Sequence, residues 1–175
     1  MTTIPTLQTE RLILRPPSAA DRDLYVRFFD CAEASALYGG PLKPHEAWRI
    51  LAQDLGHWHL KGFGKWTLQR RADGALIGGC GLVHLEGWPS HELTWWLLPE
   101  HRGSGFATEA SHEVIAYAYD TLHWSHVETH MRDENASAHA IAKRLRGVFD
   151  RRSTFPDGFT RDVFRLPHPA MSEAS

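Results

Sequence analysis

The chain has 175 residues, of which 42% are hydrophobic and 23% are charged. A chain of this length folds as one domain and buries enough surface to need neither disulfides nor a structural metal. Its 19 basic and 21 acidic residues leave a formal net charge of -2. This balance argues against non-specific nucleic-acid binding, which depends on a strong positive field.

Residue types that mark other classes of protein are present without the spacing those classes require. Cys31 and Cys80 stand in neither a redox nor a metal-binding pattern, and the 12 histidines form no ligand motif, so no metal is expected. The first residues show no signal-peptide pattern, and no apolar run reaches the ~18–20 residues of a membrane span. We therefore expect a cytoplasmic protein without a membrane partner.

The first third of the chain predicts one strand and two helices. Residues 11–15 form a strand that ends at Pro16 and Pro17. One helix follows Ser18, and a second begins at Pro44 after the Gly-Gly-Pro break at 39–41. The inward face expected for this second helix consists of Trp48, Leu51, Leu55 and Trp58.

The rest of the chain alternates between strands and helices. We expect strands at 65–69, 76–84 and 91–98, a helix at 104–119, a strand at 127–132, a helix at 135–145 and a hairpin of strands at 149–155 and 160–166. Three glycines interrupt the strand at 76–84. Only the strand–helix–strand unit at 91–132 requires a parallel, right-handed crossover. The order predicts an α+β fold with a mixed sheet of about seven strands and helices on both faces.

A glycine loop joins the strand at 91–98 to the helix after it. Gly103 and Gly105 let the backbone pass close to a ligand, and the N-terminus of the helix favours a pyrophosphate. Arg102 can add a charge-assisted bond. Alone, two such glycines are also compatible with a simple tight turn. A P-loop is excluded because no Lys-Ser or Lys-Thr follows, and Thr108 replaces the third glycine of a dinucleotide fingerprint.

Four segments together resemble the GNAT superfamily of acetyltransferases, in the branch that includes ribosomal-protein N-terminal alanine acetyltransferases. They are Thr9–Arg15, Gly78–Leu82, Glu92–Leu97 leading into Arg102–Ala110, and Asn135–Ser137 with its helix. The resemblance covers about residues 9–167 of a single acetyltransferase domain at 1–175. It implies a splayed sheet in which the strands at 91–98 and 127–132 start paired and then diverge around acetyl-CoA, the co-substrate.

The resemblance also implies which residues hold acetyl-CoA. The backbone of Trp96, Leu97 and Leu98 would bind the pantetheine arm. The pyrophosphate would lie on the loop and helix start formed by Arg102, Gly103, Ser104, Gly105, Phe106, Ala107 and Thr108. Asn135 would contact the cofactor from the other side, and Lys143 would approach the nucleotide phosphates.

The implied reaction is direct acetyl transfer to a primary amine, either a peptide N-terminus or a small amine. Glu92 is the candidate base, with Glu109 as the alternative carboxylate. Where the family commonly has a serine or tyrosine to protonate the thiolate, this chain has Ala138, so Ser137 beside it is the candidate acid. The missing hydroxyl keeps open a second hypothesis, a non-catalytic acyl-CoA-binding or sensing module. An NAD-dependent oxidoreductase is a further alternative.

The acceptor pocket is expected between the first two helices, the break at 39–41 and the loop at 86–91. Its candidate aromatic lining, most of which is expected in the core, consists of Tyr38, Trp58, Trp66, Trp88 and Trp96. Nothing in this lining resembles an acidic groove for polyamines. A homodimer is the default assembly.

Overall fold

A computed structural model describes residues 3–172; residues 1–2 and 173–175 of the expected 1–175 domain lie outside this description. Two antiparallel sheets carry all the strands of the described chain. The first has the order β1 (Leu7–Gln8), β2 (Leu12–Arg15), β3 (Lys65–Arg70), β4 (Leu76–Val83), β5 (Glu92–Leu97). The second has the order β6 (Val127–Met131), β8 (Thr160–Leu166), β7 (Val148–Thr154). The helices are α1 (Arg22–Asp30), α2 (Ala32–Ser35), α3 (Pro44–Lys61), α4 (Phe106–Asp120) and α5 (Ala136–Arg144).

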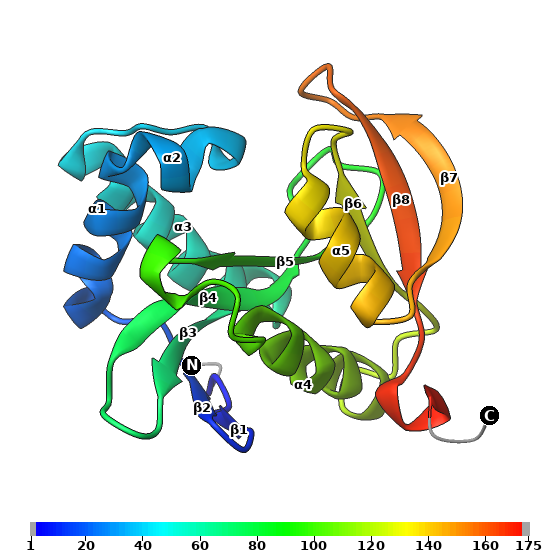
Figure 1. Cartoon of the computed structure of the whole chain (residues 1–175), viewed down its shortest axis with the longest axis horizontal. Helices are drawn as coiled ribbons and strands as arrows, with labels where there is room; N and C mark the ends of the chain where they lie inside the picture. Colours follow the sequence, from blue (N-terminus) through cyan, green and yellow to red (C-terminus); the bar gives the residue numbers. More distant parts are fainter. Residues whose placement is uncertain (1–2, 173–175) are drawn as a thin grey trace.

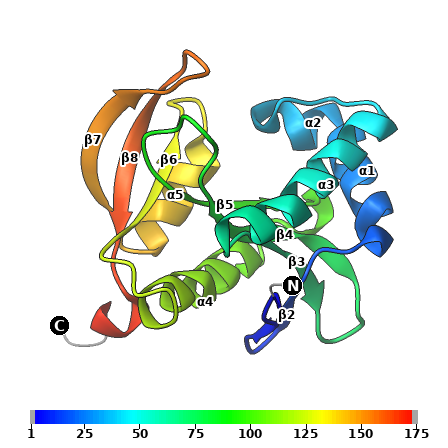
Figure 2. The ribbon, with the colours of Figure 1, turned by 180° about the vertical axis from the view of Figure 1, so that it is seen from behind.

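Helices cover both faces of the five-stranded sheet (Figures 1 and 2). Because side chains alternate along β5, Trp96 points toward α1 and α3, whereas Leu93 packs into the core that contains α4. The inner stripe expected for α4 is buried: Ala107, Ala110, Val114 and Ala118. The predicted α+β class with helices on both faces is confirmed, and the hairpin of β7 and β8 lies where the sequence predicted it.

The junction between β5 and β6 differs from the expectation. These strands were expected to begin as a backbone pair, but in the part of the chain described no ladder joins them and the sheet is divided in two. Side chains make the connection instead. The Thr129 hydroxyl donates to the Leu93 carbonyl at 2.9 Å, and the Glu128 N–H donates to Nε2 of His91 at 3.3 Å. The expected backbone pairing is therefore wrong: at the start of β5 the two strands are joined by side chains and not by a ladder.

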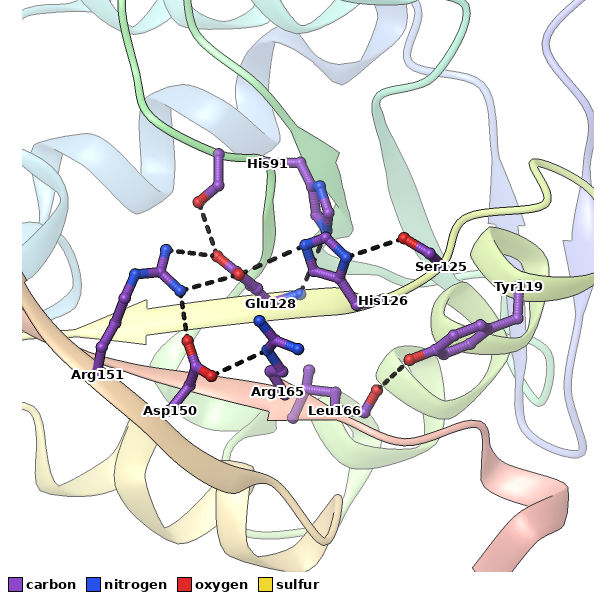
Figure 3. Close-up of polar contacts among 10 residues, drawn as sticks. His91, Tyr119, Ser125, His126, Glu128, Asp150, Arg151, Arg165 and Leu166 are labelled. Atoms are coloured by element: carbon purple, nitrogen blue, oxygen red, sulfur yellow. Dashed lines mark hydrogen bonds and ion pairs between the residues drawn. The ribbon is translucent and has the colours of Figure 1, made fainter.

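Glu128 is the centre of a polar network behind this junction (Figure 3). Its carboxylate accepts bonds from Ser90 at 2.7 Å and from both Nη atoms of Arg151 at 3.0 Å, and its side chain is 3% exposed. Burial opposes ionisation, but these bonds and the Arg151 charge lower the pKa of Glu128. Asp150 then connects Arg151 to Arg165. The network holds the three-stranded sheet against the loop before β5.

The expected inward face of α3 is wrong at Trp48, which is 53% exposed. Ala47, Leu51 and Trp58 are buried, so the buried face is rotated by about one residue at its start. The rotation also buries Asp54, whose carboxylate receives Lys65 Nζ at 2.9 Å and the Tyr25 hydroxyl at 2.8 Å. A polar residue on the inner face is acceptable here because two partners satisfy it.

The glycines of β4 permit close packing rather than interrupting the strand, which is continuous from Leu76 to Val83. A Cβ on Gly81 would lie 2.3 Å from the Gly64 carbonyl oxygen and 2.4 Å from Lys65 Cα, both backbone atoms of the neighbouring segment. The strand therefore reaches its position only with glycine at this site.

We predict that Gly81→Ala destabilises the protein by about 3 kcal/mol, because the neighbouring backbone must move. The matched control is Gly56→Ala within α3, where a Cβ meets nothing within 4 Å. This control is expected to stabilise the protein by roughly 0.5–1 kcal/mol. Urea unfolding of both variants provides the measurement. Equal midpoints for Gly81→Ala and wild type would contradict the packing described for β4.

Candidate active site

A cavity of about 780 Å³ opens between α2, the end of β5, the start of α4 and one face of α5. Most of the expected cofactor residues border it: Trp96, Leu97, Arg102, Gly103, Gly105, Phe106, Ala107, Thr108 and Asn135, together with Ser137. Segments that are far apart in sequence thus meet around one space. Its volume is within the range of sites for cofactor-sized molecules.

Three of the expected residues do not border this cavity. The Leu98 N–H already donates to the Ile77 carbonyl at 2.9 Å, so it is not available to a ligand. The Ser104 carbonyl accepts a bond from Arg11 at 2.9 Å. Lys143 is exposed outside the cavity, and its neighbour Arg144 borders it instead. The prediction was therefore wrong by one residue in which side of the helix faces the cofactor.

The glycine loop presents a set of free backbone donors. Gly103 and Gly105 adopt φ values of +78° and +82°, a conformation that other residues rarely take. The first bond of α4 runs from the Glu109 N–H to the Gly105 carbonyl at 3.0 Å, which leaves the N–H groups of Phe106, Ala107 and Thr108 without partners inside the helix. These groups and the helix dipole favour a bound anion.

Arg102 has a structural part as well as an expected binding role. Its Nε donates to the Leu97 carbonyl and its Nη2 donates to the Ala34 carbonyl, each at 3.2 Å. The arginine therefore ties the loop to the end of β5 and to α2. Its remaining N–H groups stay free to donate, because a guanidinium carries five.

Glu109 supports the loop and is not placed to act as a base. Its carboxylate accepts from the Thr9 hydroxyl at 2.6 Å, the Arg11 N–H at 2.8 Å and Arg11 Nε at 2.6 Å. Although burial alone would raise it, these bonds lower the pKa of Glu109. Arg11 also lies 4.4 Å from the Phe106 ring centroid. Sequence reasoning missed this role of Arg11, although the residue stands in the first segment of the family resemblance.

The far edge of β5 is open toward the cavity. The carbonyls of Leu93, Trp95 and Leu97 accept from Thr129, Tyr38 and Arg102, all outside the first sheet. In an antiparallel pair, alternate residues direct both backbone groups to the same side. The N–H groups of Trp95 and Leu97 therefore point away from β4, into the gap between the two sheets. The backbone groups of Trp96, like the N–H of Leu98, face β4, so the expected backbone role of Trp96 is wrong as well.

A second cavity, of about 190 Å³, lies beside the first on the other side of the open edge. The two share Leu37, Tyr38, Trp95, Asn135 and Ala138 in their walls. Of the aromatic residues expected to line an acceptor pocket, Tyr38 and Trp88 do so here, whereas Trp58 and Trp66 are fully buried in the core. Trp96 borders the larger cavity.

Glu92 projects into the smaller cavity with 23% of its side chain exposed. Its Oε2 lies 3.4 Å from Nε2 of His130 on β6. Burial raises the pKa of Glu92 to about 8, against the lowering effects of Arg161 and Lys65. Burial also lowers the pKa of His130 to about 3. At pH 7 Glu92 is thus mostly protonated, and His130 is neutral.

The candidate acid Ser137 is exposed at the larger cavity, whereas Ala138 is buried and borders both cavities. The Asn135 side chain accepts the Ala138 N–H at 3.1 Å and so caps α5. Sequence reasoning missed His130 and Arg161, which belong to β6 and β8. No local motif marks either residue.

Residues 3–172 contain no group of three or more His, Cys, Asp or Glu side chains placed to hold a metal ion. No helix among them is long and apolar enough to cross a membrane.

The raised pKa of Glu92 predicts a pH-dependent effect of Glu92→Gln on stability. Between pH 5 and 8 the unfolded chain releases this proton while the folded protein retains it, so the wild type loses stability as pH rises. The variant has no such loss. The free energy of unfolding of the variant minus that of the wild type should therefore increase by up to about 1.4 kcal/mol per pH unit and become constant above pH 8. Urea unfolding at pH 5 to 9 measures the difference, and a constant value would contradict the raised pKa.

The chain is similar to known proteins in sequence and in fold. The model of the acetyltransferase (GNAT) domain matches residues 11–148. The uncharacterized N-acetyltransferase YoaA of Bacillus subtilis is 26% identical over 144 residues, which are 81% of each protein. A crystal structure of an acetyltransferase from Agrobacterium tumefaciens has a TM-score of 0.85 and 33% identity, and the match covers 94% of this chain and 95% of the other.

A third similarity concerns the fold alone. The ribosomal L7/L12 alpha-N-protein acetyltransferase RimL, solved with coenzyme A, has a TM-score of 0.75 at 11% identity, with 92% of this chain and 97% of that chain covered. The family match spans most of the present chain, including β5, the glycine loop and α5. The chain is therefore an acetyltransferase and belongs to the GNAT family.

Proposed function

We propose that this enzyme transfers the acetyl group of acetyl-CoA directly to a primary amine, a peptide N-terminus or a small amine, that occupies the smaller cavity. The observation that carries the proposal is the meeting of two cavities at the open edge of β5, with Glu92 in the smaller one and the glycine loop on the larger one. The GNAT family uses acetyl-CoA, which accounts for the larger cavity.

In this proposal the diphosphate of acetyl-CoA lies on the free N–H groups between Gly103 and Thr108. The pantetheine arm follows the open edge of β5 and bonds to the backbone of Leu97, which replaces Leu98 in this role. Asn135 keeps its side-chain NH₂ free to donate to the cofactor, because its oxygen is already used as the cap of α5. Arg144, at the end of α5, supplies the positive charge first expected of Lys143.

The reaction requires a neutral amine and a leaving thiolate. Glu92, in its ionised form, accepts the proton of the ammonium; the amine then attacks the thioester carbonyl, the C–N bond forms and the C–S bond breaks. The Trp95 N–H of the open edge, at the wall shared by the two cavities, stabilises the oxyanion. The thiolate takes a proton from Ser137 or from water that reaches it at the exposed edge of α5, and the proton that the attacking nitrogen loses on becoming an amide replaces it.

The pKa of Glu92 matches one kind of amine better than the other. An α-amine has a pKa of ~7.7–8.0 and a lysine side chain has ~10.4. A carboxylate with a pKa of about 8 takes a proton from an α-ammonium at almost no cost, whereas a lysine-like ammonium costs roughly 3 kcal/mol more. This supports an α-amino group as the acceptor.

Replacing Glu92 by glutamine should lower kcat at least 100-fold, in the range of general base catalysis, and leave the Kd of acetyl-CoA unchanged. Free-thiol release with a panel of amines gives kcat, and isothermal titration gives the Kd. The matched control is Glu86→Gln, because the Glu86 side chain is 96% exposed on the preceding loop. A Glu92→Gln enzyme with wild-type kcat and an unchanged pH–rate profile would reject the role of Glu92.

The cofactor assignment predicts selective stabilisation. A ligand at a hundred times its Kd stabilises the folded state by ~2.7 kcal/mol, or roughly 5–11 °C in Tm for a domain of this size. Acetyl-CoA and CoA should produce such a shift, whereas NAD should produce none. A shift with NAD and none with acetyl-CoA would favour the oxidoreductase alternative and contradict the assignment of the glycine loop.

A further inference from the structure

The smaller cavity contains positive side chains that acetyl transfer itself does not require. We propose that the acceptor is a small primary amine that also carries a carboxylate, and that Arg161 binds this carboxylate while Glu92 faces the amine. The inference rests on the proposed function, since it identifies the substrate class of the same cavity.

Arg161 is held in one orientation and keeps donors free. Its two Nη atoms donate to Asp157 at 2.8 and 2.5 Å, Nη1 also donates to the Phe159 carbonyl at 3.4 Å, and its side chain is 14% exposed. The guanidinium carbon lies 5.4 Å from the Trp88 ring centroid and 5.0 Å from that of Phe155. Asp157 takes one hydrogen from each Nη and Phe159 takes the second of Nη1, so within residues 3–172 the Nε N–H and one N–H of Nη2 have no acceptor. A planar guanidinium fixed in this way suits a carboxylate.

The two arginines of the cavity lining are less exposed to water than their acidic partners. The Asp157 side chain is 34% exposed and is therefore screened by water more than Arg161. Arg161 affects the pKa of Glu92 more strongly than Asp157 does, and the same order holds at His130. Arg132, a second cation of the lining, is 21% exposed, whereas its partner Glu134 is 58% exposed. An anionic group on the ligand is consequently favoured.

His130 gives an independent indication that a polar ligand belongs here. Its side chain is 2% exposed and it lines the cavity; although Nε2 lies 3.4 Å from Glu92, neither ring nitrogen has a hydrogen-bond partner among the described residues. Trp88 stacks on it at 5.8 Å, and Phe155 lies at 4.2 Å. A buried imidazole without a partner is unfavourable, and a ligand donor or acceptor next to Glu92 would satisfy it.

The size of the cavity separates small amines from peptides. At about 190 Å³ it is smaller than the usual 300–1,000 Å³ of a drug-sized site, so it fits one amino-acid-sized molecule. A peptide N-terminus would place a neutral amide where the cavity offers a guanidinium. A polyamine would bring further positive charge toward Arg161 and Arg132. Both are disfavoured, and the amine with a carboxylate remains.

Binding to the CoA-saturated protein tests the proposal without depending on turnover. Glycine, leucine and phenylalanine are each compared by isothermal titration with their amides and with their decarboxylated amines. We expect at least one amino acid to bind ten or more times as tightly as both of its analogues. Arg161→Gln should reduce that preference to less than threefold. The matched control is Arg165→Gln, because Arg165 is on the same strand and pairs with Asp150, outside the cavity (Figure 3).

Asp157→Asn gives a second test in case Arg161→Gln folds poorly, which an altered CoA affinity would reveal. Because it removes the screening carboxylate and keeps the guanidinium, it should preserve or increase the preference for amino acids over their amides and amines.

Amides or amines that bind as tightly as the amino acids, or no binding of any amino acid, would overturn the proposal. Thiol release separates the two hypotheses: a carboxylate preference in binding without acetyl transfer would reject only the proposed function. Equal transfer to amino acids and amides would reject only the inference.

Discussion

The absence of a backbone ladder between β5 and β6, both within the described residues, determines the geometry of the active site. If these strands paired along their length, the N–H groups of Trp95 and Leu97 would bond to β6. Instead, the Thr129 hydroxyl and the His91 ring hold the two strands together at one end only. The gap beyond these contacts has room for two cavities that share walls.

The polar network around Glu128 supports this junction. A buried carboxylate is stable only when charged and polar partners satisfy it, and Arg151 and Ser90 do so. The glycine loop has a comparable support in Glu109 and Arg11, which bind each other, and Arg11 also donates to the Ser104 carbonyl of the loop. In both places a paired carboxylate positions backbone groups. Glu92, in contrast, has no arginine partner within ion-pair distance among the described residues, which suits a base.

The parts of the site formed by residues adjacent in the chain were predictable from the sequence. The loop at 102–108 combines glycines, a preceding strand and a following helix, and all of these are adjacent in the chain. The resemblance to GNAT acetyltransferases added Asn135 and Glu92, and both lie at the cavities. The family and fold that the resemblance implied are confirmed by the domain match and by the structure from Agrobacterium tumefaciens.

The predictions from sequence that were wrong concern two features: which face of a helix or strand points inward, and which distant segments come into contact. Trp48 was assigned inward and Lys143 toward the cofactor, because a helical pattern leaves the rotation of a face uncertain by about one residue. Leu98 was expected to bind the cofactor, but which alternate residue of a strand faces outward depends on how it pairs. His130 and Arg161 come within reach of Glu92 only through the packing of the second sheet, which no local pattern encodes.

Amide hydrogen exchange, resolved by residue with and without acetyl-CoA, tests most directly the claim that the open edge of β5 and the glycine loop hold the cofactor. We predict that acetyl-CoA protects the N–H groups of Leu97 and of residues 103–108. The Leu98 N–H, already bonded to Ile77, should change little. Saturation with acetyl-CoA that leaves residues 103–108 and Leu97 as exchangeable as in the free protein would contradict the account.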